Sequence, residues 1–105
     1  MPSKVYTSEK HITNRIMKFL KDRGCYAVKQ HGGRFGRAGV PDIICCYCGA
    51  FVAFEVKSSR PGATTSPAQN ANIREIQAAG GYVNVVRSVD EVQRIFDSFD
   101  AGNDQ

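Results

Sequence analysis

The strongest constraint on the fold is a pair of apolar segments joined by a very short connection. Residues 43–47 (IICCY) and 51–57 (FVAFEVK) are rich in the β-branched and aromatic side chains that favour strands, and residues 48–50 (CGA) between them favour a tight turn. Two strands joined in this way pair as an antiparallel hairpin, in which the numbers of opposite residues should sum to about 98. The hairpin therefore predicts that Asp42 lies beside Glu55.

Helical patterns and one further strand pattern flank the hairpin. Ile12, Ile16 and Leu20 recur at helical spacing, and residues 66–69 (SPAQ) have the serine, proline and glutamine of a capping box at a helix start. The expected elements, in chain order, are a helix over 8–23, a strand over 25–30, the two hairpin strands, a helix over 67–79, a strand over 82–86 and a helix that begins at 89.

This order of elements predicts an α/β protein with an αβββαβ(α) core, in which a small mixed sheet is flanked by helices. A chain of 105 residues is long enough for one such domain, which we expect to span residues 1–96. Residues 97–105 are acidic and are expected to form a frayed C-terminal tail. The apolar residues of the last helix that are expected to face inward are Val92, Ile95, Phe96 and Phe99.

Positive charge is concentrated in the first part of the chain. Residues 1–60 contain 11 Lys and Arg against 4 Asp and Glu, a net charge of +7, whereas residues 61–105 contain 3 against 6, a net charge of −3. A basic half of this size suits a polyanion such as DNA, because Lys and Arg release the counterions condensed on phosphates; a well-solvated surface explains it equally well. We find no membrane span or signal peptide, so we expect a cytoplasmic protein of a bacterium or a phage-infected host.

Four cysteines raise the alternatives of a metal site and a redox pair. Cys45 and Cys48 have the spacing of a C-x-x-C motif, but a strand would direct them to opposite faces, which does not suit chelation. A four-ligand site would also have to recruit Cys25 or a histidine, because the sequence has no second C-x-x-C pair. We expect buried free thiols in a reducing compartment instead.

Glu55 and Lys57 are two residues apart in the second hairpin strand and therefore share one of its faces. The apolar residues that alternate with them take the other face and can bury against a helix. With Asp42 across the hairpin, two carboxylates and one ammonium group should meet at one end of the sheet.

This combination suits the hydrolysis of a phosphodiester. Two carboxylates can hold Mg²⁺, a hard cation that prefers oxygen ligands, or Mn²⁺, which accepts the same ligands. The metal would screen the phosphate charge and lower the pKa of a bound water, while Lys57 would orient that water and stabilise charge in the transition state. A strand salt bridge is the better explanation for an isolated E-x-K, but the P-D dipeptide across the hairpin favours the metal site.

The segments Val40-Pro41-Asp42 and Glu55-Val56-Lys57 resemble the P-D…(D/E)-x-K signature of the restriction-endonuclease-like superfamily. The G-V-P-D form, the S-P-A-Q segment and a glutamate in the first helix more narrowly resemble the virus-type replication-repair nuclease (VRR-NUC) domain. The resemblance covers most of the chain, from Glu9 to about Glu91. It implies a restriction-endonuclease-like fold and a metal-dependent nuclease.

The resemblance also implies roles for individual residues. Asp42 and Glu55 would bind the metal together with the main-chain carbonyl of Val56, and Lys57 would be the catalytic lysine. Glu9, which helical spacing places on the same face as the apolar stripe, would match a glutamate that reaches toward the metal. From spacing alone, a favourable interaction with the helix dipole explains Glu9 better.

Gln69 would match a glutamine that opens the second helix at the edge of the active site. A capping-box partnership with Ser66 explains it equally well and does not exclude that role.

The glycine-rich segment 31–39 (HGGRFGRAG) leads directly into the P-D dipeptide. Its glycines allow the backbone to approach a phosphate, its two arginines can clamp that phosphate, and its phenylalanine can stack on an unpaired base. An ordinary solvated loop is the alternative. The DNA-binding candidates on this and neighbouring loops are Arg34, Phe35, Arg37, Lys29 and Arg60.

From these features we expect a Mg²⁺-dependent endonuclease that recognises DNA by shape and phosphates, because a chain of this length has little surface for reading bases. The resemblance implies a homodimer that acts on branched DNA, such as four-way (Holliday) junctions. The alternatives are a sequence-tolerant or restriction-type nuclease and a DNA-binding module whose catalytic site has decayed.

Overall fold

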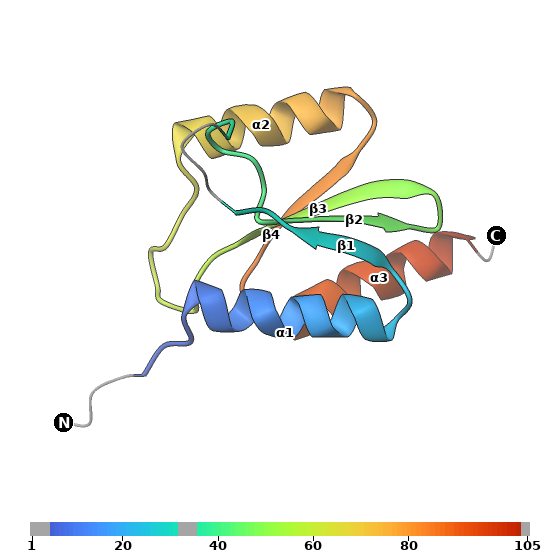
Figure 1. Ribbon diagram of the computed structural model, residues 1–105, viewed down its shortest axis with the longest axis horizontal. Helices are drawn as coiled ribbons and strands as arrows, with labels where there is room; N and C mark the ends of the chain where they lie inside the picture. The colour runs from blue at the N-terminus through green and yellow to red at the C-terminus, as the bar shows by residue number, and fades with distance from the viewer. Residues whose placement is uncertain (1–4, 32–35, 104–105) are drawn as a thin grey trace.

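The computed structural model describes residues 5–31 and 36–103, and the predicted order of helices and strands is confirmed there. The fold is α/β, with helices on both faces of a mixed sheet (Figure 1). In chain order the elements are α1 (Glu9–Asp22), β1 (Tyr26–Lys29), β2 (Ile43–Tyr47), β3 (Ala50–Val56), α2 (Pro67–Ala78), β4 (Tyr82–Val86) and α3 (Val89–Asn103).

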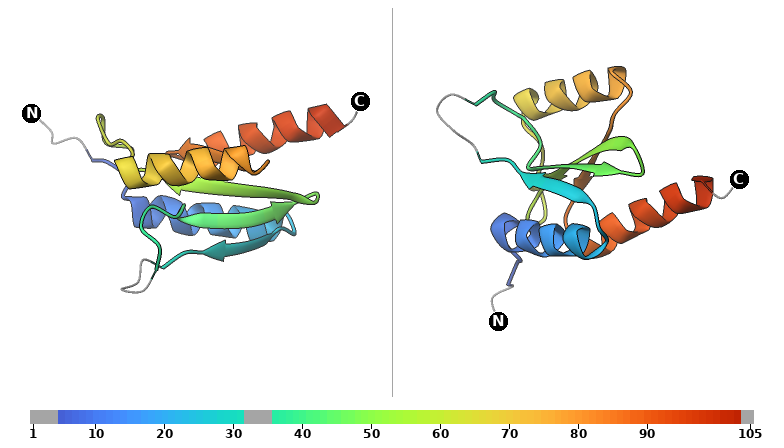
Figure 2. Two further views of the ribbon diagram at one scale, coloured as in Figure 1. Left: turned by 90° about the horizontal axis from the view of Figure 1, so that it is seen from above. Right: turned by 45° about the vertical axis from the view of Figure 1, so that its right-hand side comes forward.

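The four strands lie in the order β1-β2-β3-β4. The pairs β1–β2 and β2–β3 are antiparallel, whereas β3 and β4 are parallel because α2 connects them. Helix α2 covers one face of this sheet and α1 and α3 cover the other, as the views in Figure 2 show. The central strand β3 is therefore enclosed on both faces.

The turn between β2 and β3 is tighter than predicted. It consists of Cys48 and Gly49, whose φ values of 50° and 82° are both left-handed, as a two-residue type I′ hairpin turn requires. Tyr47 consequently pairs with Ala50, and the numbers of opposite residues sum to 97, where about 98 was expected. The prediction of the register was wrong by one residue because Ala50 belongs to the strand.

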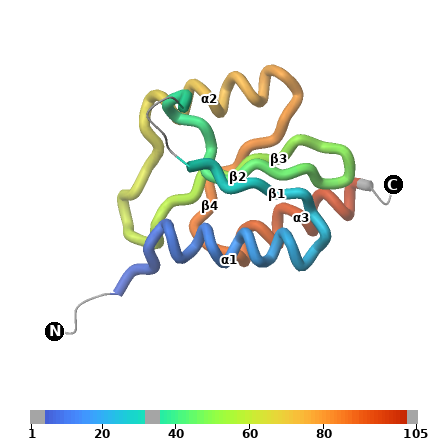
Figure 3. Tube along the Cα trace, in the orientation of Figure 1, coloured from blue at the N-terminus to red at the C-terminus, as the bar shows by residue number. Residues whose placement is uncertain are grey.

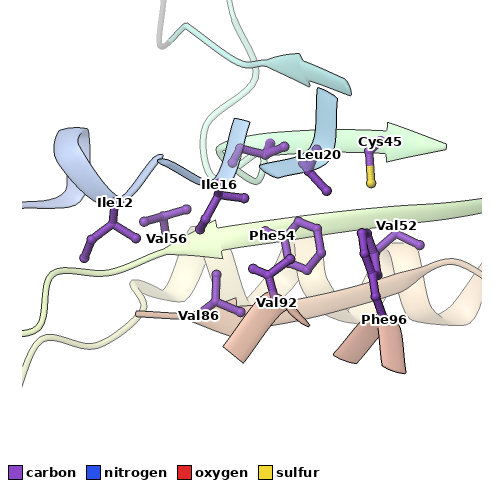
Figure 4. Close-up of a cluster of buried hydrophobic side chains, with 11 residues drawn as sticks. Ile12, Ile16, Leu20, Cys45, Val52, Phe54, Val56, Val86, Val92 and Phe96 are labelled. Carbon is purple, nitrogen blue, oxygen red and sulfur yellow. The ribbon is translucent and has the colours of Figure 1, made fainter. Parts of the chain in front are cut away.

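The hydrophobic core lies between the sheet and the α1–α3 layer (Figure 4). Val52, Phe54 and Val56 of β3 are completely buried, as their alternation in the sequence predicted. Burying one such side chain stabilises the folded state by roughly 1.5–3 kcal/mol. The other members of this cluster are Ile12, Ile16, Leu20, Ile43, Cys45, Val86, Val92 and Phe96.

The last helix extends past residue 96, after which the sequence predicts a frayed tail. It continues to Asn103, and Asp100 on its last turns accepts hydrogen bonds from the Tyr47 hydroxyl (2.5 Å) and the Arg23 guanidinium (3.0 Å). The Tyr47 ring stacks on Phe96, with 4.2 Å between ring centroids. These contacts attach the last turns of α3 to Tyr47 and Arg23, and the acidic sequence of this segment did not predict them.

The cysteines are free, but only Cys45 is fully buried. Burial raises the pKa of the Cys45 thiol to about 12, which makes that thiol unreactive. Cys46 in β2 and Cys48 in the hairpin turn are exposed, so the expectation that the thiols are buried was wrong for these two. Within residues 5–31 and 36–103, no helix is both long and apolar enough to span a membrane.

Candidate active site

The structure brings the predicted acidic and basic groups together at the end of β3. Asp42 directly precedes β2, and its Oδ2 accepts a hydrogen bond of 2.7 Å from the backbone N–H of Val56. Lys57 follows β3, and its Nζ lies 3.8 Å from Oε1 of Glu55. The two-residue turn and the strand alternation thus produce the predicted cluster of two carboxylates and one ammonium group.

Gln69 connects this cluster to the first turn of α2. Its side-chain Oε1 accepts hydrogen bonds from Lys57 Nζ (3.1 Å) and from the backbone N–H of Ser66 (2.8 Å), and its Nε2 donates to Glu55 Oε1 (2.9 Å). The Ser66 hydroxyl in turn accepts from the backbone N–H of Gln69, which completes the capping box. One glutamine therefore caps the helix and orients both charged residues of β3.

The charged pair is more buried than an open surface site would be. Glu55 is 1% exposed and Lys57 is 8% exposed, because α2 covers this face of the sheet. Asp42 is half-buried and lines a cavity of about 310 Å³, together with His31 and the 36–40 segment. The cluster is therefore open to solvent on the Asp42 side.

The environment of Glu55 favours either a proton or a cation. Burial, followed by the hydrogen bond and the negative charge of Asp42, raises the pKa of the Glu55 carboxyl to about 8, although Lys57 lowers it. When Glu55 is ionised, its buried Oε2 has no hydrogen-bond donor, because the neighbouring Asp42 carboxylate is itself an acceptor. An unpartnered buried oxygen beside a second carboxylate fits a hard divalent cation.

The main-chain carbonyl of Val56 is also suitably directed. The N–H and C=O groups of one strand residue point to the same side of the strand, and the N–H of Val56 points to Asp42. Asp42, Glu55 and this carbonyl are thus the oxygen ligands that the cluster offers.

Helical spacing had suggested that Glu9 faces the core, but in the structure it does not. It is exposed, because the first turn of α1 lies beyond the buried stripe, which begins at Ile12. Its negative charge still raises the pKa of Glu55, as the weakest of the contributing causes. In the described part of the chain, no three His, Cys, Asp or Glu side chains form a group that could hold a metal ion, so Glu9 is not joined to the Asp42–Glu55 pair.

The DNA-binding candidates differ in their surroundings. Arg34 and Phe35 lie outside the described residues. Arg37 is exposed and forms an ion pair with Glu75 of α2, while the Lys29 ammonium donates a hydrogen bond of 3.4 Å to Asn14. Arg60 is exposed on the loop between β3 and α2.

That loop, residues 58–66, runs past the start of α1 on its way to α2 (Figure 3). Ser59 exchanges hydrogen bonds with Thr7 there, and Arg87 donates to the carbonyls of Ser58 and Ala63. Arg87 directly follows β4, and its position in the sequence gave no signal of this role.

Sequence reasoning also missed Asn72, a polar residue buried in α2. Its spacing of three residues from Gln69 was the available signal. That spacing was ambiguous, because neighbouring positions of the helix also carry small and polar residues.

A sequence profile of the archaeal Holliday junction resolvases (Hjc) matches residues 6–67, which is more than half of the chain. The chain belongs to the Hjc family. The matched segment of this Hjc-family protein contains Glu9, Asp42, Glu55 and Lys57 and ends before Gln69.

A solved structure described as a VRR_NUC domain has the same fold as this Hjc-family chain. The TM-score is 0.72 and the sequence identity 23%, over 87% of this chain and 96% of that one. A comparison with curated proteins gives no match. The predicted resemblance to the VRR-NUC domain is confirmed in the fold. The match to the Hjc family supports a nuclease.

Proposed function

We infer that this protein is a divalent-metal-dependent endonuclease that cuts branched DNA, four-way junctions in particular, as a homodimer. The observation that carries the proposal is the Asp42–Glu55 carboxylate pair, in which the buried Glu55 has one unpartnered oxygen and Lys57 and Gln69 lie beside it. The name of the matched family supports junctions as the substrate.

The metal ligands would be Asp42, Glu55 and the carbonyl of Val56, with Mg²⁺ as the expected ion and Mn²⁺ as an ion that accepts the same oxygens. When bound, such an ion screens the phosphate charge and lowers the pKa of a coordinated water. Glu9, at the start of α1, would act on this ion through solvent.

Lys57 would stabilise the negative charge that develops on the phosphate in the transition state. Its ammonium group is held by Gln69 at 3.1 Å, so it needs no reorganisation when the reaction begins. Gln69 also fixes Oε1 of Glu55 at 2.9 Å, which leaves the other carboxylate oxygen free for the metal. One glutamine thus aligns the metal ligand with the cationic group.

DNA would be held by its phosphates. The net charge of +7 in residues 1–60 attracts a polyanion. Arg37 lies on the segment before Asp42, Lys29 at the end of β1 and Arg60 on the loop between β3 and α2. A junction has to be cut on two strands, which one active site per subunit of a homodimer achieves. Such an activity would serve DNA repair.

The test compares cleavage of a labelled four-way junction with cleavage of linear duplexes that have the same arm sequences, in Mg²⁺, in Mn²⁺ and in EDTA. Lys57→Ala should abolish cutting. Lys18→Ala, which removes the same charge from an exposed ion pair on α1, should leave cutting unchanged. Sedimentation measures whether the active species is a dimer.

Each alternative predicts a different outcome. Equal cutting of junction and duplex would remove the structure selectivity, and discrete plasmid fragments would indicate a restriction-type nuclease. Junction binding without cutting in either metal would identify a DNA-binding module with a decayed site. A monomer at full activity would overturn the homodimer.

A further inference from the structure

The segment before the P-D dipeptide, residues 36–39, is docked along one face of α2. Its contacts fall on Ala68, Asn72 and Glu75, whose spacing of four and three residues places them on one face of the helix. Figure 3 shows this green segment beside the first turns of α2. Gln69, one residue after Ala68, points instead to the sheet, so α2 contacts the loop and the active site at the same time.

Asn72 makes the central contact of this docking. It is 7% exposed, and its Nδ2 donates hydrogen bonds of 2.9 Å to the backbone carbonyls of Ala38 and Ala68. A primary amide has two N–H donors, and both are used here. One of these bonds stays within the helix and the other ties the loop to it.

Gly39 makes the closest contact. A Cβ atom at this position would lie 2.4 Å from the carbonyl oxygen of Ala68 and 2.8 Å from the backbone nitrogen of Gln69. Both neighbours are main-chain atoms of the first helical turn and cannot move aside as a side chain could. The glycine of the G-V-P-D segment therefore lets the loop touch the turn that carries Gln69.

We propose that Asn72 is a positioning residue. Together with Gly39 it attaches the loop that carries Arg37 to α2, so that this loop keeps a constant position relative to Gln69 and the catalytic cluster. This inference rests on the proposed nuclease function. The Asp42 carboxylate is held independently by Val56, so the metal ligands do not require the docking. The docking serves to align the DNA phosphate with the metal ligands and Lys57.

The first test variant is Asn72→Asp. It keeps the size of the side chain but places an anionic acceptor 2.9 Å from two carbonyl oxygens, so the loop contact is lost. Asn70→Asp is the matched control, because it adds the same charge to the same helix. The Oδ1 of Asn70 accepts a hydrogen bond from Thr65 at 2.5 Å, and an aspartate preserves that bond.

The second variant is Gly39→Ala, which introduces the clash with the first turn of α2. Gly24→Ala is its control. Gly24 has a φ of 79°, close to the 83° of Gly39, but its Cβ would meet no atom within 4 Å. The control therefore carries the same backbone strain without the clash.

Four measurements are made at a temperature at which every variant is folded. We expect single-turnover cleavage of the junction to fall by about tenfold or more in Asn72→Asp and Gly39→Ala, since small displacements of reacting groups cost this much. The dissociation constants for Mn²⁺ and for the junction should stay within about twofold of the matched controls, because the metal ligands are retained and each control carries the same charge as its variant. Trypsin should cut the bond after Arg37 faster in both variants than in the controls.

Wild-type cleavage rates in the folded Asn72→Asp and Gly39→Ala proteins would overturn the proposal. So would an equal loss in the Asn70→Asp control, because added charge would then explain the effect. Unaltered trypsin cleavage after Arg37 would show that these contacts do not hold the loop. If wild type cuts no DNA, the proposed function fails, whereas the trypsin comparison still tests the docking.

Discussion

Replacing Glu55 with glutamine should stabilise the metal-free protein at alkaline pH. Burial and the adjacent Asp42 raise the pKa of Glu55 to about 8 in the folded state, from an ordinary value of 4.5. Between these two values the folded protein keeps a proton that the unfolded chain has lost. The free energy of unfolding therefore decreases as pH rises through this window, by about 1.4 kcal/mol for each pH unit.

The effect is large enough to measure by thermal unfolding. Between about pH 6 and pH 8, the free energy of unfolding of wild type should fall by about 2 kcal/mol relative to that of Glu55→Gln. This corresponds to a decrease of roughly 8 °C or more in Tm for a domain of this size. Glutamine has nearly the same shape but cannot ionise, so the variant is free of this loss. Below the unfolded pKa both proteins are neutral at this position, and the advantage of the variant disappears.

The assay is circular dichroism in EDTA at a series of pH values, with Glu75→Gln as the control for an exposed glutamate. Added Mg²⁺ should raise the Tm of wild type and of this control at pH 8, but not that of Glu55→Gln, because the cation replaces the proton between the two carboxylates. A difference in Tm between wild type and Glu55→Gln that is the same at pH 6 and pH 8 would refute the reasoning. It would mean that Glu55 does not hold a proton in the folded state.

Three further predictions concern other parts of the molecule. Lys57→Ala should lower kcat by about 10²–10³ while calorimetry still detects Mg²⁺ binding, since the lysine is not a ligand; loss of binding would contradict its assigned role. Glu75→Gln should tighten junction binding by up to about fivefold, measured by fluorescence anisotropy, because it releases Arg37 from an exposed ion pair. Asp100→Asn should lower the free energy of unfolding in urea by about 1 kcal/mol through its weakened contact with Tyr47; an unchanged value would indicate that the end of α3 contributes nothing.

The order of helices and strands could be read from the sequence because each element carries its own local signal. The capping box at 66–69 predicted the start of α2, and the alternation of apolar residues predicted which face of β3 is buried. The register error at the hairpin had a local cause as well. The sequence did not reveal that Cys48, a residue other than glycine, adopts a left-handed φ.

The sequence alone determined that Asp42, Glu55 and Lys57 meet, because strand alternation and a short turn depend only on neighbouring residues. The tertiary structure decided how buried these groups are, since the raised pKa of Glu55 depends on α2, which crosses the sheet face above it. It also decided that Glu9 is exposed and that Asn72 contacts the loop before Asp42. Desolvation and contacts between distant segments depend on the final placement of whole helices, and no short stretch of sequence encodes that placement.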